Sequence, residues 1–502
     1  DTHFMVLILA VFTVVVMPLV AVLLSYNQIQ QLVHRAEGFA AKTVCCAVFL
    51  SNRSVDKFLT ENELSTLPPF IVGSTVNQEE GYVESYFLTK ELSSVFRMPT
   101  ATAVYLGPHL GCQLHSETFQ QSHMKYRSKA IPPPPLPRPE SRSSCVEEVL
   151  NNEFSAAGLA HNQTRAAVVI HRGKIVGEAY QSLMGITAAM PLLGWSMTKS
   201  VHTAILGAAI TAGVVSLDDA LELPDMSHAK KERLTELNGG VPLTFRSLLH
   251  MSDVLEIEEN YGIFADIAHM LYGSPDSAAF AVSRTTRDIT PPATGKNESS
   301  FGWYYSSGVS NTIAKELRAR FPSEEMYQQF PQTHLFSRIG ATSFAVEMDT
   351  SGTFIASSFA YATARDWARL GELFLRQGRW EGEQILPEGF VELVQQPHPR
   401  SGGHYGGQFW LNPARVSVAE YNVLPHDHRE KVRRMWTTEV LPADAFYMNG
   451  YLGQTTMIIP SLDLVIVRLG FTRDTVKGQV ITWDPKVFYG GILECVRAEY
   501  RQ

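Results

Sequence analysis

The feature that most constrains the fold is an uncharged run near the beginning of the chain. Residues 4–24 read FMVLILAVFTVVVMPLVAVLL and contain no charged side chain. At the rise of an α-helix, these 21 residues span about 31 Å, enough to cross the hydrocarbon core of a bilayer. Ser25, Tyr26 and Asn27 follow, without the small-residue cleavage site of a signal peptide. The run predicts a single-pass transmembrane anchor with a kink at Pro18; a buried helix is the alternative.

The charges around this run do not decide its orientation. Asp1 and His3 precede it, and His34 and Arg35 follow only at some distance, which leaves the positive-inside rule little to count. Two localisations stay open: a bacterial inner membrane with the protein facing the periplasm, or a mitochondrial inner membrane. The lipid bilayer is the expected partner of residues 4–24.

Length and composition favour more than one folded unit. With 502 residues the chain exceeds one ordinary core. A net charge of −8 argues against a nucleic-acid partner, which usually requires a basic face. The run IPPPPLPRP at residues 131–139 favours an extended linker. It separates a small mixed region, residues 25–130, from a larger domain, residues 140–502. In the small region we expect strands at 47–50 and 102–106.

The larger domain has the pattern of an α+β fold. We expect strands at both of its ends and helices between them, so that N- and C-terminal segments close one antiparallel sheet flanked by helices. The expected strands are 166–170, 175–179, 455–459 and 464–469. The expected helices are 197–212, one that begins at a capping box at 363–366 and ends near Gly378, and 485–500.

Ser196 and Lys199 form the motif S-x-x-K at the start of an apolar helix. A serine hydroxyl needs a base before it becomes a good nucleophile. Residues three apart share a helix face, and burial lowers the pKa of a lysine so that its neutral amine can act as that base. Three other matches, at Ser54, Ser122 and Ser227, stand in polar surroundings and are expected to be surface residues.

Two further segments could complete such a site. Tyr305, in the run YSSG, could relay a proton to a leaving group, with Ser307 bonding the substrate; a loop tyrosine is the alternative. The run GYLGQ at residues 450–454 precedes the C-terminal strands, and its glycines would let a strand edge approach a ligand. A backbone N–H there could form an oxyanion hole with that of Ser196; a plain turn is the alternative.

The cysteines and histidines do not indicate a metal site. The five cysteines lack paired C-x-x-C spacing, and the run HDH at residues 426–428 has no further ligand cluster nearby. No metal and no organic cofactor are therefore expected. Cys45 or Cys46 could bridge to Cys112, which would imply an oxidising compartment. For Cys495 we expect a buried free thiol.

The order S-x-x-K, tyrosine, glycine-rich strand resembles the serine β-lactamase and penicillin-binding superfamily. Within it, the chain is similar to the 6-aminohexanoate-dimer hydrolase-like serine hydrolases. The similarity covers roughly residues 140–500 through the blocks LLGWSMTKSV, LLHMSDVLEIEENYG, ADIAHMLYG, YYSSGVSN, SSFAYATARDWARLGELFLRQGRW and PSLDLVIVRLG. It implies a β-lactamase/transpeptidase-like fold that includes a mainly helical subdomain.

The resemblance also implies roles for single residues. Ser196 corresponds to the acylated nucleophile, Lys199 to its general base, and Tyr305 to the tyrosine that protonates the leaving group. The remaining correspondences concern substrate and oxyanion: Ser307 takes the place of an asparagine, Tyr451 that of a lysine or histidine, Gly453 that of the motif glycine, and the backbone N–H of Gln454 that of the second oxyanion donor.

This chain also departs from the family pattern. Tyr451 is uncharged, so that a cation for a substrate carboxylate is missing and β-lactam hydrolysis is not expected. Asp253-Val254 replaces Ser-Gly, and residues 291–302 carry extra polar residues before the tyrosine motif. The first hypothesis is a serine hydrolase that cleaves a small amide or ester through an acyl-enzyme. The second is a hydrolase-like accessory subunit of a membrane complex, for example a respiratory one. An esterase for lipid-like substrates is the third.

Overall fold

The computed structural model spans residues 1–502 and comprises two compact units. Outside the described residues lie 1–16, 54, 56–71, 116–141, 156, 159–162, 238–239, 252–254, 256, 260–263, 285–302, 399–400, 416–438, 473–474, 477–478, 481–482 and 500–502. Unit 1 consists of residues 1–105, 112–123 and 260–275, and unit 2 of residues 106–111, 124–259 and 276–502. The predicted linker, residues 131–139, lies outside the described residues.

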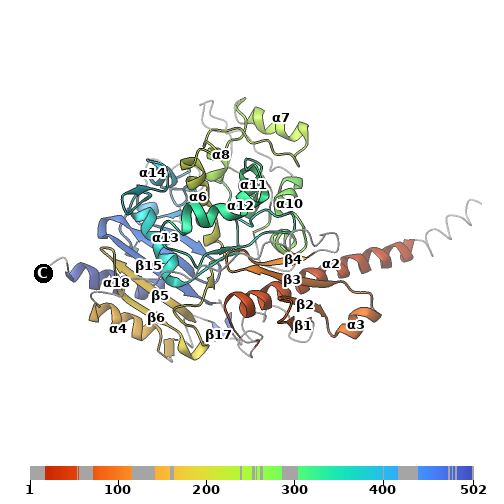
Figure 1. The fold of residues 1–502 in the computed structure, drawn as a ribbon, viewed down its shortest axis with the longest axis horizontal. Helices are drawn as coiled ribbons and strands as arrows, with labels where there is room; N and C mark the ends of the chain where they lie inside the picture. The colour runs from red at the N-terminus through yellow and green to blue at the C-terminus, as the bar shows by residue number, and fades with distance from the viewer. Residues whose placement is uncertain are drawn as a thin grey trace, which may run out of the picture. The chain divides into compact units, whose positions relative to one another are not determined.

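Unit 1 is built from one long helix and a four-stranded sheet (Figure 1). Helix α2 spans Met17–Cys45 and packs against the sheet through β1 and β2, and against the short helix α9. The strands follow one another in the order β1 Val72–Asn77, β2 Tyr82–Phe87, β3 Thr100–Gly107 and β4 Gly111–His115, with the short helices α3 Lys90–Val95 and α9 Asp266–Tyr272. A disulfide joins Cys45 at the end of α2 to Cys112 on β4, which confirms one of the two bridges considered.

The predicted single-pass membrane topology is wrong for the part of the chain that the structure describes. No helix there is both long and apolar enough to cross a membrane. Residues 4–16 of the expected anchor lie outside the described residues, and residues 17–24 begin α2. The helix then continues through Gln30, Arg35 and Glu37 to Cys45 and packs sideways on its own sheet. A run of apolar residues therefore does not by itself show where a helix ends, because the same helix can continue into polar sequence.

One of the two strands expected in this unit is also wrong. Residues 47–50 belong to a π-helical turn, η2, which spans Cys46–Leu50 and continues directly from α2. Backbone bonds from Ser51 N to Cys46 O (2.9 Å) and from Arg53 N to Ala47 O (2.8 Å) hold the turn. A run of four apolar residues is too short to distinguish a strand from buried helical backbone. The other strand is confirmed within β3.

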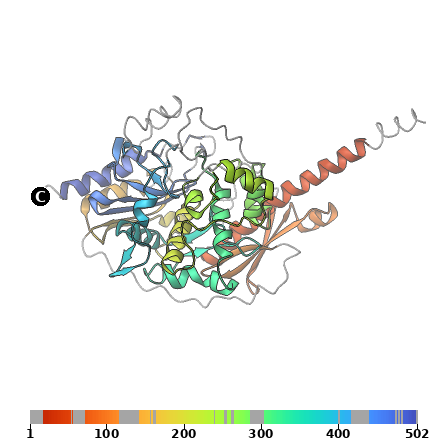
Figure 2. The same cartoon turned by 90° about the horizontal axis from the view of Figure 1, so that it is seen from above.

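Unit 2 is organised around a six-stranded antiparallel sheet in the order β12-β13-β14-β15-β5-β6. Its strands are β5 Thr164–His171, β6 Lys174–Tyr180, β12 Trp410–Leu411, β13 Phe446–Gly450, β14 Gln454–Ile459 and β15 Leu464–Gly470. Strand β15 pairs with β5, for example Val467 with Val168, so that segments 300 residues apart close the sheet as the sequence predicts. The C-terminal strands and the last helix, drawn in blue, lie together at one end of the unit (Figure 2).

Helices cover both faces of this sheet because its strands are apolar on both sides. On one face, Ala167, Val169 and Ile466 share a core with helices α4 and α18. On the other face α13 packs closely: a Cβ added to Gly371 would lie 2.7 Å from Val465. Thr363 caps α13 by accepting from Asp366 N, which confirms the predicted helix start. The reciprocal half of the expected capping box is absent, because Thr363 N donates to Ser343 Oγ instead. The α+β class with an antiparallel sheet flanked by helices is therefore confirmed, without the transmembrane helix.

The α-helices of unit 2, including α4, α13 and α18, lie between β6 and β12 in sequence or flank the sheet. They are α4 Ser144–Glu153, α6 Met197–Thr211, α7 His228–Leu237, α8 Phe245–Leu249, α10 Ser277–Ser283, α11 Ser307–Arg318, α12 Glu324–Pro331, α13 Ala364–Leu375, α14 Phe390–Val394 and α18 Pro485–Glu499. Short strands form three small sheets: β7 Leu192–Leu193 with β9 Ala360–Ala362 and β8 Ala345–Val346, β10 Arg379–Trp380 with β11 Glu383–Gln384, and β16 Thr475–Val476 with β17 Gln479–Val480.

The expectation of a free thiol at Cys495 is wrong. Cys495 on α18 forms a disulfide with Cys145 on α4, 350 residues earlier. The two helices pack against each other on the same face of the sheet, which brings the cysteines together, and no local pattern announces such a pairing. Cys46 is buried and takes part in neither disulfide. Two disulfides are typical of proteins in oxidising compartments.

Candidate active site

Ser196 stands at the end of a tight turn that leads from β7 into α6. Trp195 has a positive φ of 48°, which is uncommon and strained for a residue with a side chain. Gly194 leaves no room for one, because a Cβ there would lie 2.3 Å from the ring of Trp367. Thr198 fastens the turn: its hydroxyl donates to Trp195 O (2.6 Å) and accepts from Ala360 N (2.9 Å). The block LLGWSMTK thus specifies a rigid strand-to-helix turn that presents Ser196.

Lys199 lies one helical turn after Ser196, with its amine among three oxygen acceptors. Its Nζ is 3.2 Å from Ser196 Oγ, 3.0 Å from Ser307 Oγ and 3.1 Å from the carbonyl oxygen of Ser357. Both Ser196 and Lys199 are buried, with exposed fractions of 9% and 2%. Burial lowers the pKa of Lys199 from 10.5 to about 8, and the charge of Glu259 opposes this shift. A lysine with this pKa is readily available as a neutral base near physiological pH.

Ser307, the first residue of α11, connects Lys199 to a carboxylate. Glu259 accepts hydrogen bonds from Ser307 N (2.5 Å) and from Ser307 Oγ (2.9 Å). Burial raises the pKa of Glu259, while the charge of Lys199 and the bonds from Ser307 lower it. The cap of α11 is the preceding residue, Ser306, whose side chain accepts from Val309 N. The run YSSG therefore provides a helix start as well as a site residue.

Tyr305 presents its ring to the lysine. The Nζ of Lys199 lies over this ring, 4.7 Å from its centroid, in a cation–π arrangement. The ring also packs against Tyr405 and Trp410, with centroids 5.7 Å and 5.5 Å away. The neighbouring Tyr304 points elsewhere, since its hydroxyl donates to the carbonyl of Ile257.

The hairpin between β13 and β14 approaches the serine turn from the sheet. A Cβ on Gly450 would lie 2.1 Å from the carbonyl oxygen of Gly194, so glycine is required for this close approach. Tyr451 packs edge-on against Trp195, with centroids 5.6 Å apart, and is 40% exposed. Two aromatic rings, those of Trp195 and Tyr451, thus pack together beside the serine turn.

Gly453 and Gln454 hold this hairpin together. Gly453 has a φ of +81°, and its carbonyl accepts from the buried guanidinium of Arg468 (2.7 Å). Gln454 stands opposite Gly450 in the strand register. Its side chain donates to the carbonyls of Tyr451 (3.0 Å) and Gly470 (2.7 Å) and accepts from Gly470 N (2.9 Å). The structure thus gives the side chain of Gln454 a supporting part within the hairpin.

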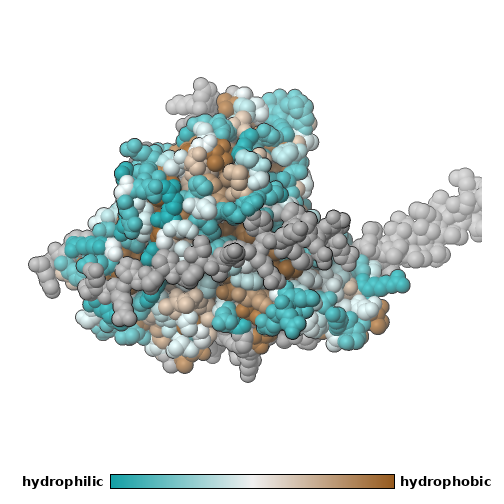
Figure 3. Space-filling model, viewed as in Figure 1, coloured by the Kyte–Doolittle hydropathy of each residue, from teal (hydrophilic) through white to brown (hydrophobic). Residues whose placement is uncertain are grey.

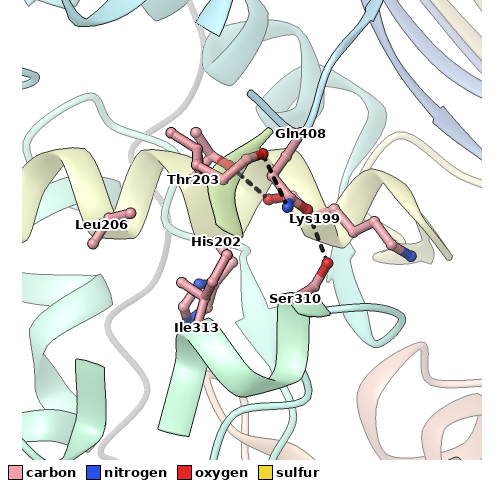
Figure 4. Close-up of a pocket in the computed structure, with 8 residues that line it drawn as sticks. Lys199, His202, Thr203, Leu206, Ser310, Ile313 and Gln408 are labelled. Atoms are coloured by element: carbon pink, nitrogen blue, oxygen red, sulfur yellow. Dashed lines mark hydrogen bonds between the residues drawn. The ribbon is translucent and has the colours of Figure 1, made fainter. Parts of the chain in front are cut away.

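A small cavity lies behind the lysine, on the side of α6 that faces α11 (Figure 4). Gln408 forms one wall and fastens three segments: it accepts from Ser310 Oγ (2.8 Å) and Ser200 Oγ (2.7 Å), and donates to Leu249 O (3.3 Å). His202 also lines the cavity, and burial lowers its pKa to about 3. His202 is therefore neutral and adds no charge near Lys199.

Three residues of this arrangement were not expected from the sequence. Glu259 lies in the block LEIEENYG but is one of 50 acidic residues. The carbonyl of Ser357 bonds Lys199 across 158 positions, and Asn311 Oδ1 accepts from Ser357 N (3.1 Å). A local pattern cannot reveal such long-range contacts. Both oxygens of Glu259 are engaged by Ser307, and the lysine beside them disfavours a metal cation. Residues 253–254 and 291–302, where departures were noted, lie outside the described residues.

The surface of the described residues is mainly hydrophilic in the view of Figure 3. On unit 2, its exposed large apolar side chains include Leu183, Val241, Met326 and Val487, which come from separate elements. Isolated apolar residues of this kind are normal on a protein surface. The aromatic residues around Ser196 are therefore the more informative feature of unit 2.

Comparison with known proteins gives similarity of fold rather than of sequence. No family model matches the chain. An uncharacterised protein of Alkalihalophilus pseudofirmus is 29% identical over 140 residues, which is 27% of this chain and 37% of that protein. The chain therefore matches little more than a third of this relative's length.

Solved structures similar to this chain come from the superfamily that the sequence predicted. A 6-aminohexanoate-dimer hydrolase from Bacillus anthracis is 20% identical, with a TM-score of 0.48 over 68% of this chain and 81% of that one. A penicillin-binding protein from Bacillus halodurans is 13% identical (TM-score 0.43, 71% and 99% covered). A class C β-lactamase from Rhodobacter sphaeroides is 14% identical (TM-score 0.41, 72% and 99% covered). The similarity of these three structures to the chain is one of fold and covers 68–72% of it.

Proposed function

We propose that this protein is a serine hydrolase that cleaves a small amide or ester through an acyl-enzyme on Ser196. The observation that carries the proposal is the buried contact between Lys199 Nζ and Ser196 Oγ at 3.2 Å. A nucleophile and a base within hydrogen-bond reach are the signature of covalent catalysis. The lowered pKa of Lys199 supports the role of base.

The proposed reaction has two halves. Ser196 Oγ attacks the carbonyl carbon while its proton passes to the neutral amine of Lys199. Backbone N–H groups of Ser196 and Gln454 stabilise the oxyanion, each worth about 3 kcal/mol of barrier. Tyr305 donates its hydroxyl proton to the leaving amine or alcohol and regains the proton held by Lys199, while the bond between the carbonyl carbon and the leaving group breaks. The acyl group stays on Ser196 Oγ until water hydrolyses it. Ser307 and Tyr451 contact the substrate, and Gly453 permits the hairpin turn beside it.

The surroundings of Ser196 favour a substrate without a carboxylate near the scissile bond. Tyr451 and Trp195 pack together beside the nucleophile, and Phe359 lies 6.2 Å from Trp195 between ring centroids. Aromatic rings offer apolar contact but no charge for an anion. An uncharged acyl group of an ester or amide fits these walls better than a penicillin carboxylate.

The test is covalent labelling of the full chain. A fluorophosphonate probe, and in a parallel sample a β-lactam, would be added, and peptide mass spectrometry would locate the adduct. We expect fluorophosphonate labelling on Ser196, its loss in Ser196→Ala, and little acylation by the β-lactam. A folded wild-type protein without label on Ser196 would contradict the proposal.

The role of Tyr305 is tested by Tyr305→Phe, which keeps the ring under Lys199 and removes only the hydroxyl. Hydrolysis of an ester with a poor leaving group should fall about 100-fold, as for a lost general acid, while an activated ester should be much less affected. Tyr304→Phe is the matched control, because the Tyr304 hydroxyl donates to the backbone carbonyl of Ile257. Equal losses for both esters would exclude the role of proton donor.

A further inference from the structure

The site contains a carboxylic acid that the mechanism above does not use. Glu259 directly precedes residues 260–275 of unit 1 in sequence but belongs to unit 2. Its two oxygens accept from the backbone and the hydroxyl of Ser307, at 2.5 Å and 2.9 Å. A carboxylate with both oxygens bound to one residue beside a buried lysine is held in a definite position. This position needs an explanation, since an ionised carboxylate in a largely enclosed site is costly.

The hydrogen bonds form a continuous path from Lys199 to Glu259. The amine of Lys199 donates to Ser307 Oγ over 3.0 Å, and Ser307 Oγ donates to Glu259 over 2.9 Å. A hydroxyl can accept one proton while it passes its own to the next acceptor. Lys199 and Glu259 form no salt bridge among the ion pairs of the described residues, so the hydroxyl between them is the link that the structure provides.

We propose that Glu259 takes up the proton of Lys199 through the Ser307 hydroxyl, so that the resting site holds a neutral lysine and a neutral glutamic acid. The transfer is balanced: one N–H bond of Lys199 breaks, Ser307 Oγ gains that proton and releases its own, and one O–H bond forms on Glu259. The charges of buried Lys199 and part-buried Glu259 disappear together, and no ion is released to solvent. This inference rests on the proposed function, because it explains how Lys199 becomes a base before substrate arrives.

The electrostatic surroundings agree with this assignment. Among the described residues, only the charge of Lys199 shifts the pKa of Glu259, and only the charge of Glu259 shifts the pKa of Lys199. Burial moves the two pKa values toward each other, down for the lysine and up for the acid. The neighbouring phenol of Tyr405 has a pKa well above its usual range and stays neutral, as does His202. Neither Tyr405 nor His202 therefore competes with the pair for its proton.

The pH dependence of labelling distinguishes a proton acceptor from a mere counter-charge. Suppose that the Lys199–Glu259 pair is active when it holds one proton. The fall of the labelling rate at low pH, the acid limb, then reports the pKa at which the doubly protonated pair loses its first proton. The pKa of that step cannot be higher than the pKa that Lys199 has when residue 259 is uncharged. Glu259→Gln leaves such a lone lysine, so the acid limb moves to higher pH. If Glu259 only attracts the lysine's charge, its removal lowers the lysine pKa and the limb moves to lower pH.

The experiment measures the rate of fluorophosphonate labelling of Ser196 against pH in wild type, Glu259→Gln and the adjacent Glu258→Gln. We expect the wild-type limb below pH 8, an upward shift in Glu259→Gln, and no shift for the exposed control. A downward shift in Glu259→Gln with a labelled wild type would overturn this inference alone. No label in folded wild type would overturn both the inference and the proposed function.

An independent measurement does not need activity. At pH 7 the infrared spectrum of wild type should contain the carbonyl stretch of a protonated carboxyl that vanishes in Glu259→Gln and remains in Ser196→Ala. If Glu259→Gln does not fold, Glu259→Asp serves, because the band then shifts to that of an aspartic acid. Glu37, buried in unit 1 with a pKa raised to about 8, supplies a second such band that should persist in each variant. Absence of a band that depends on residue 259 would overturn the inference.

Discussion

Two of the cations buried in unit 2, Lys199 and Arg468, have contrasting surroundings. Arg468 is fully enclosed, with Glu153 3.6 Å away, bonds to Thr164 (3.0 Å) and Thr472 (2.7 Å), and the ring of Trp483 3.8 Å from its guanidinium carbon. Lys199 has hydroxyls and a carbonyl around its amine, and its acid lies beyond Ser307. Arg468 thus has a carboxylate, hydroxyls and an aromatic ring as partners, whereas the direct hydrogen-bond partners of Lys199 are all neutral.

The difference shows how the same burial produces structure in one place and reactivity in another. Burial lowers the pKa of Arg468 only to about 10, so that it stays charged and fastens the hairpin through Gly453. Burial lowers the pKa of Lys199 to about 8, within reach of neutral pH. A guanidinium that is always protonated suits the first task, and a primary amine suits the second.

The largest effect is expected when the reactive cation is removed. Lys199→Met keeps the length of the side chain and removes the base, so labelling of Ser196 by the fluorophosphonate should fall by about 10³-fold or more. Lys199→Arg should fall equally, because arginine cannot lose its proton. The labelling rate at pH 7 checks this, with circular dichroism to establish folding. A rate within tenfold of wild type in either variant would remove Lys199 from the mechanism.

Removal of the structural cation should damage stability instead. Arg468→Met leaves the carboxylate of Glu153 buried without its cation and frees the carbonyl of Gly453, at a cost of about 3–5 kcal/mol in the free energy of unfolding. Urea denaturation measures this. The double variant Arg468→Met with Glu153→Leu should recover part of the loss, since no charge is then left unpaired. A small loss in the single variant would mean that water reaches Glu153.

Whether the sequence predicts these features depends on how far apart along the chain the contacting residues lie. Ser196 and Lys199 are local neighbours at the start of α6, and their catalytic roles stay a proposal. The N-cap of α13 at Thr363 and the hairpin β5–β6 are also local, and these two predictions agree with the structure. The partners of both cations are not local: Thr164 lies 304 positions from Arg468, and Ser357 lies 158 from Lys199. The same holds for the Cys145–Cys495 disulfide. The membrane prediction failed because it took an apolar run as a whole element.

The pH dependence of stability offers a sharper comparison of the two cations. Lys199 is protonated in the unfolded chain up to about pH 10.5, whereas burial lowers its pKa to about 8 in the folded wild type. Between these values the unfolded state binds the extra proton, so the stability of wild type rises relative to Lys199→Met, by about 1–3 kcal/mol. Below pH 8 this contribution is absent. Melting of both proteins from pH 7 to 10 measures it; a constant difference would mean an unshifted lysine.

The smallest effect is expected where a neutral partner of Lys199 is loosened. Asn311 holds the backbone N–H of Ser357, whose carbonyl accepts from Lys199. Asn311→Ala lets this carbonyl move and misdirects the amine, so the maximal labelling rate should fall about tenfold. Ser310→Ala, the adjacent residue on α11, loses only a bond to Gln408 and should stay within twofold. Equal rates for the two variants would show that Ser307 and the helix position alone orient Lys199. The acceptors around Lys199 would then differ from the partners of Arg468 in two ways, because they are neutral and because they can be replaced.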